Sequence, residues 1–131
     1  ISELCDKDFA VTIETGGSIL KDKIDKRAVT ILDIKCPGSA MAHKNELDNI
    51  ALLLPHDEVK FVILDKNDYE FAKKLCKEHN LFKRSKPPLF SPAFNQLDSK
   101  ELVKWLLEDK LLARLNLQTH KFIWSPQTRG V

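Results

Sequence analysis

The sequence predicts an α/β fold in which a mainly parallel sheet is flanked by helices. Segments rich in apolar and β-branched residues alternate with segments whose apolar residues recur at helical spacing. Such alternation is typical of parallel strands joined by crossover connections. Two strand segments, residues 28–35 and 58–64, are near-continuous apolar runs, as expected of strands that are buried on both faces. The sheet is therefore either doubly wound or part of a barrel.

Five strands are predicted from the apolar runs and from the residues that end them. Gly16 and Gly17 end the first strand, and Pro37 and Gly38 end the second. The fourth strand is short and flanked by proline, and the last carries alternating polar residues. The predicted strands are residues 9–15, 28–35, 58–64, 88–94 and 115–122.

Three helices are predicted between these strands. Residues 45–54 place apolar side chains at helical spacing before Pro55. Residues 68–80 carry an apolar stripe that includes Cys76, and Asp65 or Asn67 can cap this helix. A third helix begins at residue 98 or 99 with a sequence resembling a capping box and runs to about residue 112.

Length and composition indicate one globular domain. The chain has 131 residues, which suits a single core, so we expect residues 1–131 to belong to one domain. Its 21 basic and 19 acidic residues are interspersed, which gives no electrostatic reason to expect nucleic acid or a membrane surface as partner. No apolar run approaches the roughly 20 residues that span a bilayer. We therefore expect a cytoplasmic protein.

The cysteines predict neither a disulfide framework nor a metal site. Cys5, Cys36 and Cys76 lie far apart, and the sequence contains no CxxC spacing. Cys36 is followed by proline and has no cysteine close to it, so a buried, unreactive thiol is the favoured interpretation.

Polar residues near the ends of the predicted strands indicate a small-molecule site. The carboxyl ends of parallel strands meet at one edge of a sheet, where ligands bind in this class of fold. We therefore expect a polar pocket at this edge, and no GxGxxG or P-loop motif accompanies it. The residues expected there are Glu14, Thr15, Gly16, Gly17, Asp33, Lys35, Lys60, Asp65, Ser91, Gln118, Thr119 and His120.

Several of these residues have a purely structural alternative. Asp33 and Lys35 share a strand face and could form an ion pair with each other instead of binding a ligand. Glu14 could be a solvated acid at a strand end, although a carboxylate in an apolar strand is costly unless it is paired. His120 could donate or accept a proton or be a structural histidine, because no nucleophile motif accompanies it.

Several segments, in order along essentially the whole chain, resemble 7-carboxy-7-deazaguanine synthases, which are radical S-adenosylmethionine enzymes of queuosine and deazapurine biosynthesis. Two of the segments, DIKCPGS and QTHKFIW, are fairly specific. The resembling segments are IETGGS (13–18), DIKCPGS (33–39), VKFVI (59–63), NDYEFA (67–72), LFSP (89–92) and LQTHKFIWSPQTRGV (117–131).

The resemblance implies a radical-SAM-type partial (β/α) barrel and a ring contraction. In that family 6-carboxy-5,6,7,8-tetrahydropterin loses ammonia and becomes 7-carboxy-7-deazaguanine. The cofactors implied are S-adenosylmethionine, a 4Fe–4S cluster that cleaves it, and Mg²⁺. A small-molecule pterin is the implied partner, and a homodimer is one assembly that we keep open.

The resemblance also implies roles for individual residues. Asp33, Ile34 and Lys35 match the strand-end tripeptide that contacts S-adenosylmethionine, and Cys36 is then a bystander. The residues implied to contact the pterin are Glu14, Gln118, His120 and the terminal carboxylate of Val131.

The sequence departs from the family in lacking its three N-terminal cluster cysteines. The magnesium-binding hydroxyl residue is also missing, so neither the cluster ligands nor the magnesium ligand is expected in this chain. We therefore interpret the chain as the C-terminal portion of the enzyme and expect it to be inactive in isolation. The alternatives are a non-catalytic α/β fragment or interaction module that keeps the scaffold, and an unrelated nucleotide-binding domain.

Overall fold

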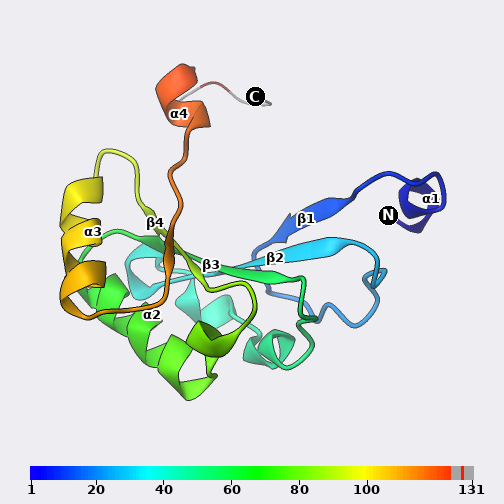
Figure 1. Cartoon of the computed structure of the whole chain (residues 1–131), viewed down its shortest axis with the longest axis horizontal. Coiled ribbons are helices and arrows are strands. Elements are labelled where there is room, and N and C mark those ends of the chain that lie inside the picture. The colour runs from blue at the N-terminus through cyan, green and yellow to red at the C-terminus, as the bar shows by residue number, and fades with distance from the viewer. Residues whose placement is uncertain (125–127, 129–131) are drawn as a thin grey trace.

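The structure, a computed structural model, contains one parallel sheet with helices packed on one of its faces. It describes residues 1–124 and 128. The sheet consists of β1 (Thr12–Thr15), β2 (Val29–Ile34), β3 (Glu58–Ile63), β4 (Leu89–Pro92) and β5 (Arg114–Leu115), in that spatial order. Every pair of neighbouring strands is parallel. The predicted α/β fold with a parallel sheet and flanking helices is confirmed (Figure 1).

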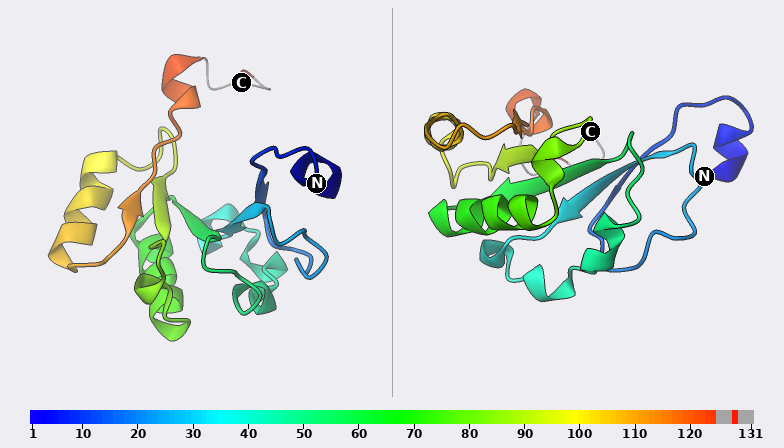
Figure 2. Two further views of the ribbon diagram at one scale, coloured as in Figure 1. Left: turned by 45° about the vertical axis from the view of Figure 1, so that its right-hand side comes forward. Right: turned by 60° about the horizontal axis from the view of Figure 1, so that its bottom comes forward.

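Two long helices and several short turns complete the chain. The helices are α1 (Ser2–Cys5), α2 (Lys66–Glu78), α3 (Ser99–Glu108) and α4 (His120–Ile123). The 3₁₀ turns are Pro37–Ser39, Ala42–Lys44, Leu47–Ile50 and Leu81–Lys83. Helix α2 and the 3₁₀ turns that follow β2 lie on one side of the sheet, whereas α4 stands on the other side (Figures 1 and 2).

The hydrophobic core lies between the sheet and helices α2 and α3. Alternate residues of the inner strands, Phe61 and Phe90 among them, are fully buried and pack with Tyr69 of α2 and Leu102 of α3. The Phe61 and Phe90 rings meet edge to face with their centroids 5.5 Å apart. Burial of one large apolar side chain contributes about 1.5–3 kcal/mol, so this layer supplies most of the stability.

The helix predicted over residues 45–54 is wrong. The chain forms one 3₁₀ turn there, Leu47–Ile50, because side-chain amides bond to backbone groups elsewhere. Asn45 bonds to Lys35, and Asn49 donates to the carbonyl groups of Gly17 and Ile19. Such bonds fix the segment against the sheet in a conformation that a continuous helix would not allow.

The last predicted strand, residues 115–122, is also wrong over most of its length. Only Arg114 and Leu115 pair with β4, in register with Leu89 and Phe90. Strand β4 ends at Pro92, so it offers few further partners to a longer neighbour. The chain then turns away from the sheet and forms α4. In the described part of the chain, no helix is long and apolar enough to cross a membrane.

Candidate functional site

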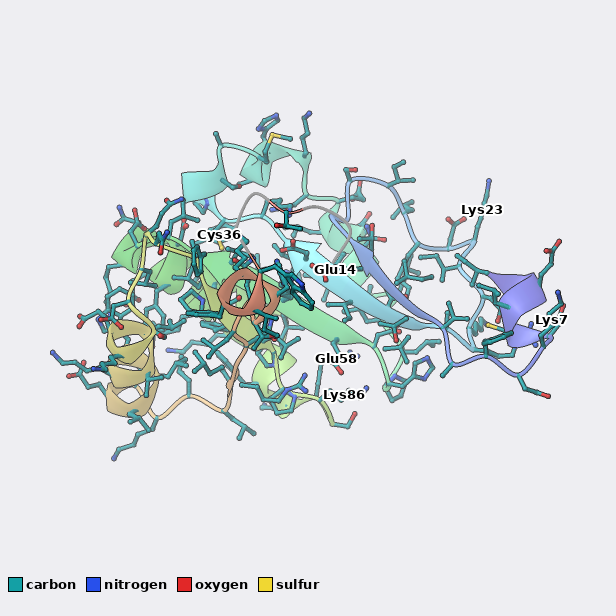
Figure 3. The ribbon with its side chains drawn as sticks, turned by 90° about the horizontal axis from the view of Figure 1, so that it is seen from above. Lys7, Glu14, Lys23, Cys36, Glu58 and Lys86 are labelled. Atoms are coloured by element: carbon teal, nitrogen blue, oxygen red, sulfur yellow. The ribbon has the colours of Figure 1, made fainter. Side chains whose placement is uncertain are left out.

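Charged and polar side chains gather on the face of the sheet opposite the core. The strand register pairs Asp33 with Lys60 and Val62 with Ser91, so Asp33, Lys60 and Ser91 point to the same side. The residues on either side of them along each strand, such as Leu32 and Phe61, point into the core. We call the side toward which Asp33, Lys60 and Ser91 point the open face, because the core helices α2 and α3 pack against the other side of the sheet. Figure 3 looks down on the molecule from the side of α4.

Glu14 lies on the open face and forms an ion pair. Its Oε1 is 2.5 Å from Nζ of Lys60, which reaches across from β3. The Glu14 side chain is 52% exposed, so the carboxylate stays in contact with solvent. Lys60 lies in the middle of β3, and our expectation that it follows the carboxyl end of that strand is wrong.

Asp33 is the most deeply buried acid of the open face. Its Oδ2 is 2.7 Å from Nζ of Lys35, so the ion pair considered from the sequence is present. Asp33 is only 8% exposed, and its Oδ1 has no hydrogen-bond partner among the residues that the structure describes. A buried carboxylate oxygen without a partner is costly. This atom is therefore available to a donor group of a ligand.

Ile34 and Cys36 turn their side chains away from the open face. Ile34 is 2% exposed and belongs to the core, so only its backbone groups could meet a ligand at the strand end. Cys36 is buried too, and burial together with the carboxylates of Asp68 and Asp33 raises the pKa of its thiol well above the usual range. The prediction that Cys36 is buried is confirmed, and a thiol with a raised pKa is a poor nucleophile or metal ligand.

A cavity of about 270 Å³ opens beyond the carboxyl end of β4. Its walls come from the loop between β4 and α3 and from the segment that leads to α4. The rings of Phe94 and Phe122 form one side, edge to face with their centroids 5.2 Å apart. Oε1 of Gln118 is buried in this region and finds no partner within the described part of the protein. No sequence pattern predicts the aromatic pair, because the two rings lie far apart in the chain.

The structure places the predicted pterin-binding residues on different elements of the fold. Gln118 lines the cavity, whereas His120 is exposed at the start of α4 and does not line it. Neither residue belongs to a strand, so their expected placement at a fifth strand end is wrong. Asp65 caps α2, where its Oδ1 accepts the N–H of Asp68 at 2.9 Å. Val131 lies outside the described residues.

Ser91 is the polar residue of β4 that faces the same side as Asp33. It is fully buried, and its Oγ lacks a hydrogen-bond partner among residues 1–124 and 128. It was expected at the strand end from the sequence, and the register places it beside Val62 of β3. Asp33 and Ser91 thus provide two buried polar atoms on one face near its carboxyl edge.

The described residues do not suit an iron–sulfur cluster or a magnesium ion. No group of three or more His, Cys, Asp or Glu side chains lies close enough together to hold a metal in the described part. Cys5, Cys36 and Cys76 are each buried and free. A cluster needs several thiolates around one point, so we derive no chemical step through a metal in this chain.

The acids at the opposite, amino edge of the sheet are fully paired. Oε1 of Glu58 accepts a hydrogen bond from Nζ of Lys86 at 3.0 Å, and Oε2 accepts one from Nη2 of Arg114 at 2.7 Å. Glu58 and Lys86 lie side by side in Figure 3. Burial alone would raise the pKa of Glu58, but the hydrogen bonds from these cations outweigh it and the pKa is lowered. Glu58 is therefore a charged structural group at neutral pH.

The fold defines an α/β protein with an all-parallel sheet, and in such proteins ligands bind at the carboxyl ends of the strands. No protein-family model matches the chain. Whole-chain comparison gives a 7-carboxy-7-deazaguanine synthase of Koribacter versatilis, 42% identical over 135 residues, covering 94% of this chain and 60% of that protein. A protein of the same name from Chlorobaculum tepidum is 38% identical, and the match covers 100% of this chain and 60% of that protein. One from Leptospira interrogans is also 38% identical, and the match covers 91% of this chain and 50% of that protein.

The chain is thus a homologue of the 7-carboxy-7-deazaguanine synthases and corresponds to a portion of their length. The resemblance stated from the sequence motifs is confirmed, because these relatives share the name and match nearly all of the chain. The chain spans at most 60% of the length of these curated relatives.

Proposed function

We propose that this chain supplies the cofactor- and substrate-facing part of a 7-carboxy-7-deazaguanine synthase. The similarity over 94% of the chain to a protein of that name carries the proposal. The complete enzyme would contract the ring of 6-carboxy-5,6,7,8-tetrahydropterin with loss of ammonia, which makes it a carbon–nitrogen lyase. The polar atoms on the open face support a role in holding ligands rather than a purely structural role.

Asp33 and Lys35 would hold S-adenosylmethionine. The cofactor carries hydroxyl and amino donors and a carboxylate, which suit the unsatisfied Oδ1 of Asp33 and the ammonium group of Lys35. Backbone groups of Ile34 would complete the contact, since its side chain is in the core. When bound in this class of enzyme, S-adenosylmethionine is the source of the radical that abstracts hydrogen. The protein groups would orient it and keep water away.

The cavity beyond β4 is our candidate for part of the pterin site. Gln118 places an acceptor oxygen at its wall, which suits the N–H groups of a pterin, and the Phe94 and Phe122 rings offer apolar surface. Glu14 and His120 are exposed and do not line the cavity, and they would contact the pterin only once it binds. The carboxylate of Val131 remains a prediction of the resemblance.

The remaining cofactors would depend on residues that this chain does not provide. We propose that a 4Fe–4S cluster and Mg²⁺ are held by the part of the enzyme that corresponds to the unmatched length of the relatives. The complete enzyme would work in the cytoplasm on a small molecule, without nucleic acid, and a homodimer is the proposed assembly.

Reconstitution of the full-length protein tests the proposal. The protein is loaded anaerobically with iron and sulfide, reduced, and given S-adenosylmethionine and 6-carboxy-5,6,7,8-tetrahydropterin. We expect 5′-deoxyadenosine and 7-carboxy-7-deazaguanine by mass spectrometry, and loss of both products in Asp33→Ala. Lys74→Ala, which changes an exposed lysine of α2, is the matched control and should remain active. An iron-loaded protein that forms neither product would overturn the proposal.

A non-catalytic interaction module is the second candidate. Strand β1 is an edge of the sheet, and exposed apolar residues such as Phe9 and Ile19 lie before and after it. A partner strand could add to this edge. Size-exclusion chromatography with light scattering tests this, because a strictly monomeric chain that binds no partner would contradict it.

A further inference from the structure

The chain stays hydrogen-bonded after it leaves β2, beyond the point where its neighbour β1 has ended at Thr15, opposite Leu32. The last residue of β2 is Ile34, and the next residue, Lys35, is held by the side chain of Asn45. Oδ1 of Asn45 accepts the Lys35 N–H at 2.9 Å, and Nδ2 donates to the Lys35 carbonyl at 2.8 Å. One side chain thus replaces the pair of bonds that a neighbouring strand would make.

These two hydrogen bonds set where the Lys35 side chain points. An extended backbone at Lys35 continues the alternation of the strand, so Lys35 emerges on the same face as Asp33. Their 2.7 Å ion pair follows from that alternation. The side-chain amide of Asn45 bonds to the backbone of Lys35, so it acts on Asp33 and Lys35 through the chain.

A second side chain, Asp68, holds the turn three residues further on. Asp68 lies in the first turn of α2 and is fully buried. Its Oδ1 accepts the Gly38 N–H at 2.8 Å, and its Oδ2 accepts the Leu64 N–H at 3.1 Å. The carboxylate therefore bridges the segments that follow β2 and β3, and both lie at the carboxyl edge of the sheet.

Gly38 is required for this approach. A Cβ at residue 38 would lie 2.7 Å from Oδ2 of Asp68, which is closer than real Cβ contacts come. A fully buried carboxylate is costly unless its oxygens are satisfied, and here two backbone N–H groups satisfy them. The buried carboxylate of Asp68 and the glycine at residue 38 together hold this turn in one position.

We propose that Asn45 and Asp68 are positioning residues that hold the backbone of residues 35–38, so that Asp33 and Lys35 meet a ligand in one fixed geometry. The identity of that ligand as S-adenosylmethionine rests on the proposed function. Residues that meet a ligand need such support, because displacement by about 1 Å can reduce activity about a hundredfold.

Ligand affinity of three variants tests the proposal. The full-length protein, reconstituted anaerobically, is titrated with S-adenosylmethionine by calorimetry. Asn45→Ala removes both bonds to Lys35, and Asp68→Asn turns one acceptor into a donor that faces an N–H group. We expect each to weaken binding at least about tenfold. Asp57→Asn is the matched control: it makes the same change at a fully buried carboxylate of the amino edge, and its affinity should stay within twofold.

Amide hydrogen exchange gives a second readout that does not require the ligand. Loss of the Asn45 or Asp68 side-chain bonds should speed exchange in a peptide covering residues 33–40 at least about tenfold, without a matching change in β4. Asp57→Asn should leave this peptide unchanged relative to the rest of the protein. If Asp68→Asn fails to fold, Asn45→Ala carries the test, because Asn45 is partly exposed.

The outcomes separate this proposal from the proposed function. If the unchanged protein does not bind S-adenosylmethionine, the proposed function fails, and hydrogen exchange alone decides on positioning. If it binds but Asn45→Ala and Asp68→Asn bind equally well, positioning is overturned. It is also overturned if all three variants lose affinity in proportion to their loss of stability, or if exchange of residues 33–40 does not change.

Discussion

Two buried carboxylates, Asp57 at the amino edge and Asp33 at the carboxyl edge, differ in how completely their oxygens are bonded. At the amino edge, Asp57 uses both oxygens: Oδ1 accepts the Thr30 N–H and Oδ2 accepts the Leu54 N–H, each at 2.8 Å. Oδ2 of Asp57 also pairs with the buried ammonium group of Lys21. At the carboxyl edge, Asp33 pairs only through Oδ2, and its Oδ1 has no partner among the described residues.

Among the buried carboxylates that the structure describes, only Asp33 leaves an oxygen without a partner, since both oxygens of Asp57 and of Asp68 are bonded. Under our proposal, this oxygen is the one that meets a ligand. Ser91 Oγ and Gln118 Oε1, which also lie toward the carboxyl edge, share the unsatisfied state of Asp33 within residues 1–124 and 128. Thr30 Oγ1, His56 Nε2 and Arg84 Nε lack partners in the same part of the chain, but the carboxylates of the amino edge are satisfied.

The largest expected effect is the loss of Asp57. Asp57→Ala removes the partner of a buried lysine and two acceptors of backbone N–H groups, so the free energy of unfolding should fall by about 3–5 kcal/mol. Urea denaturation measures this. Glu78→Gln, which changes an exposed ion pair with Lys74, is the control and should leave the midpoint nearly unchanged. A loss below about 1 kcal/mol for Asp57→Ala would contradict a stabilising amino edge.

The second largest expected effect is a loss of stability in acid, through the carboxylates of the amino edge. Hydrogen bonds and nearby cations outweigh burial and lower the pKa of both Asp57 and Glu58. A carboxylate whose pKa is lowered by folding stabilises the protein above its unfolded pKa, near 4, and this contribution is lost as the pH falls through the folded pKa. Unfolding free energies measured from pH 7 down to pH 3 should therefore decline below about pH 4.5. Glu58→Gln should make that decline shallower, and an identical decline would count against the assignment.

Asp33→Asn should separate stability from binding. The change keeps the shape of the side chain and removes one partly exposed ion pair, so the free energy of unfolding should change by less than about 1 kcal/mol. Affinity of the full-length protein for S-adenosylmethionine should fall at least about tenfold if Asp33 meets the cofactor. Calorimetry and denaturation of the same sample measure both quantities, and unchanged affinity would remove Asp33 from the site.

Glu14→Gln should have the smallest effect on stability. Glu14 is exposed, and exposed ion pairs contribute about 0–1 kcal/mol. The denaturation midpoint should stay close to that of the unchanged protein, whereas the KM for the pterin should rise if Glu14 contacts it. A clear loss of stability with an unchanged KM would make Glu14 a structural residue of the open face.

The sequence was sufficient to predict the sheet because its strands have strong local patterns. The apolar runs of β2 and β3 and the caps of α2 and α3 at Asp65 and Asp98 depend on neighbouring residues alone. The Asp33–Lys35 pair was also accessible, because strand alternation brings residues two apart to one face.

Long-range contacts explain what could not be predicted. Asn45 and Asn49 carry amides whose partners lie at Lys35 and in the loop after β1, and these bonds override the apolar helical spacing of residues 45–54. The shortness of β4 limits β5, so the alternating pattern after Leu115 finds no strand to pair with in the described chain. The cavity lined by Phe94 and Phe122 likewise depends on how α4 is placed.

Hydrogen exchange of the full-length, anaerobically reconstituted protein with and without S-adenosylmethionine tests the central claim most directly. If the carboxyl edge is the ligand site, the cofactor should slow exchange in peptides covering residues 31–40 and 89–95. A peptide covering residues 55–58 at the amino edge should not change. Protection confined to the amino edge, or no protection of either carboxyl-edge peptide at a saturating cofactor concentration, would contradict the assignment of the site.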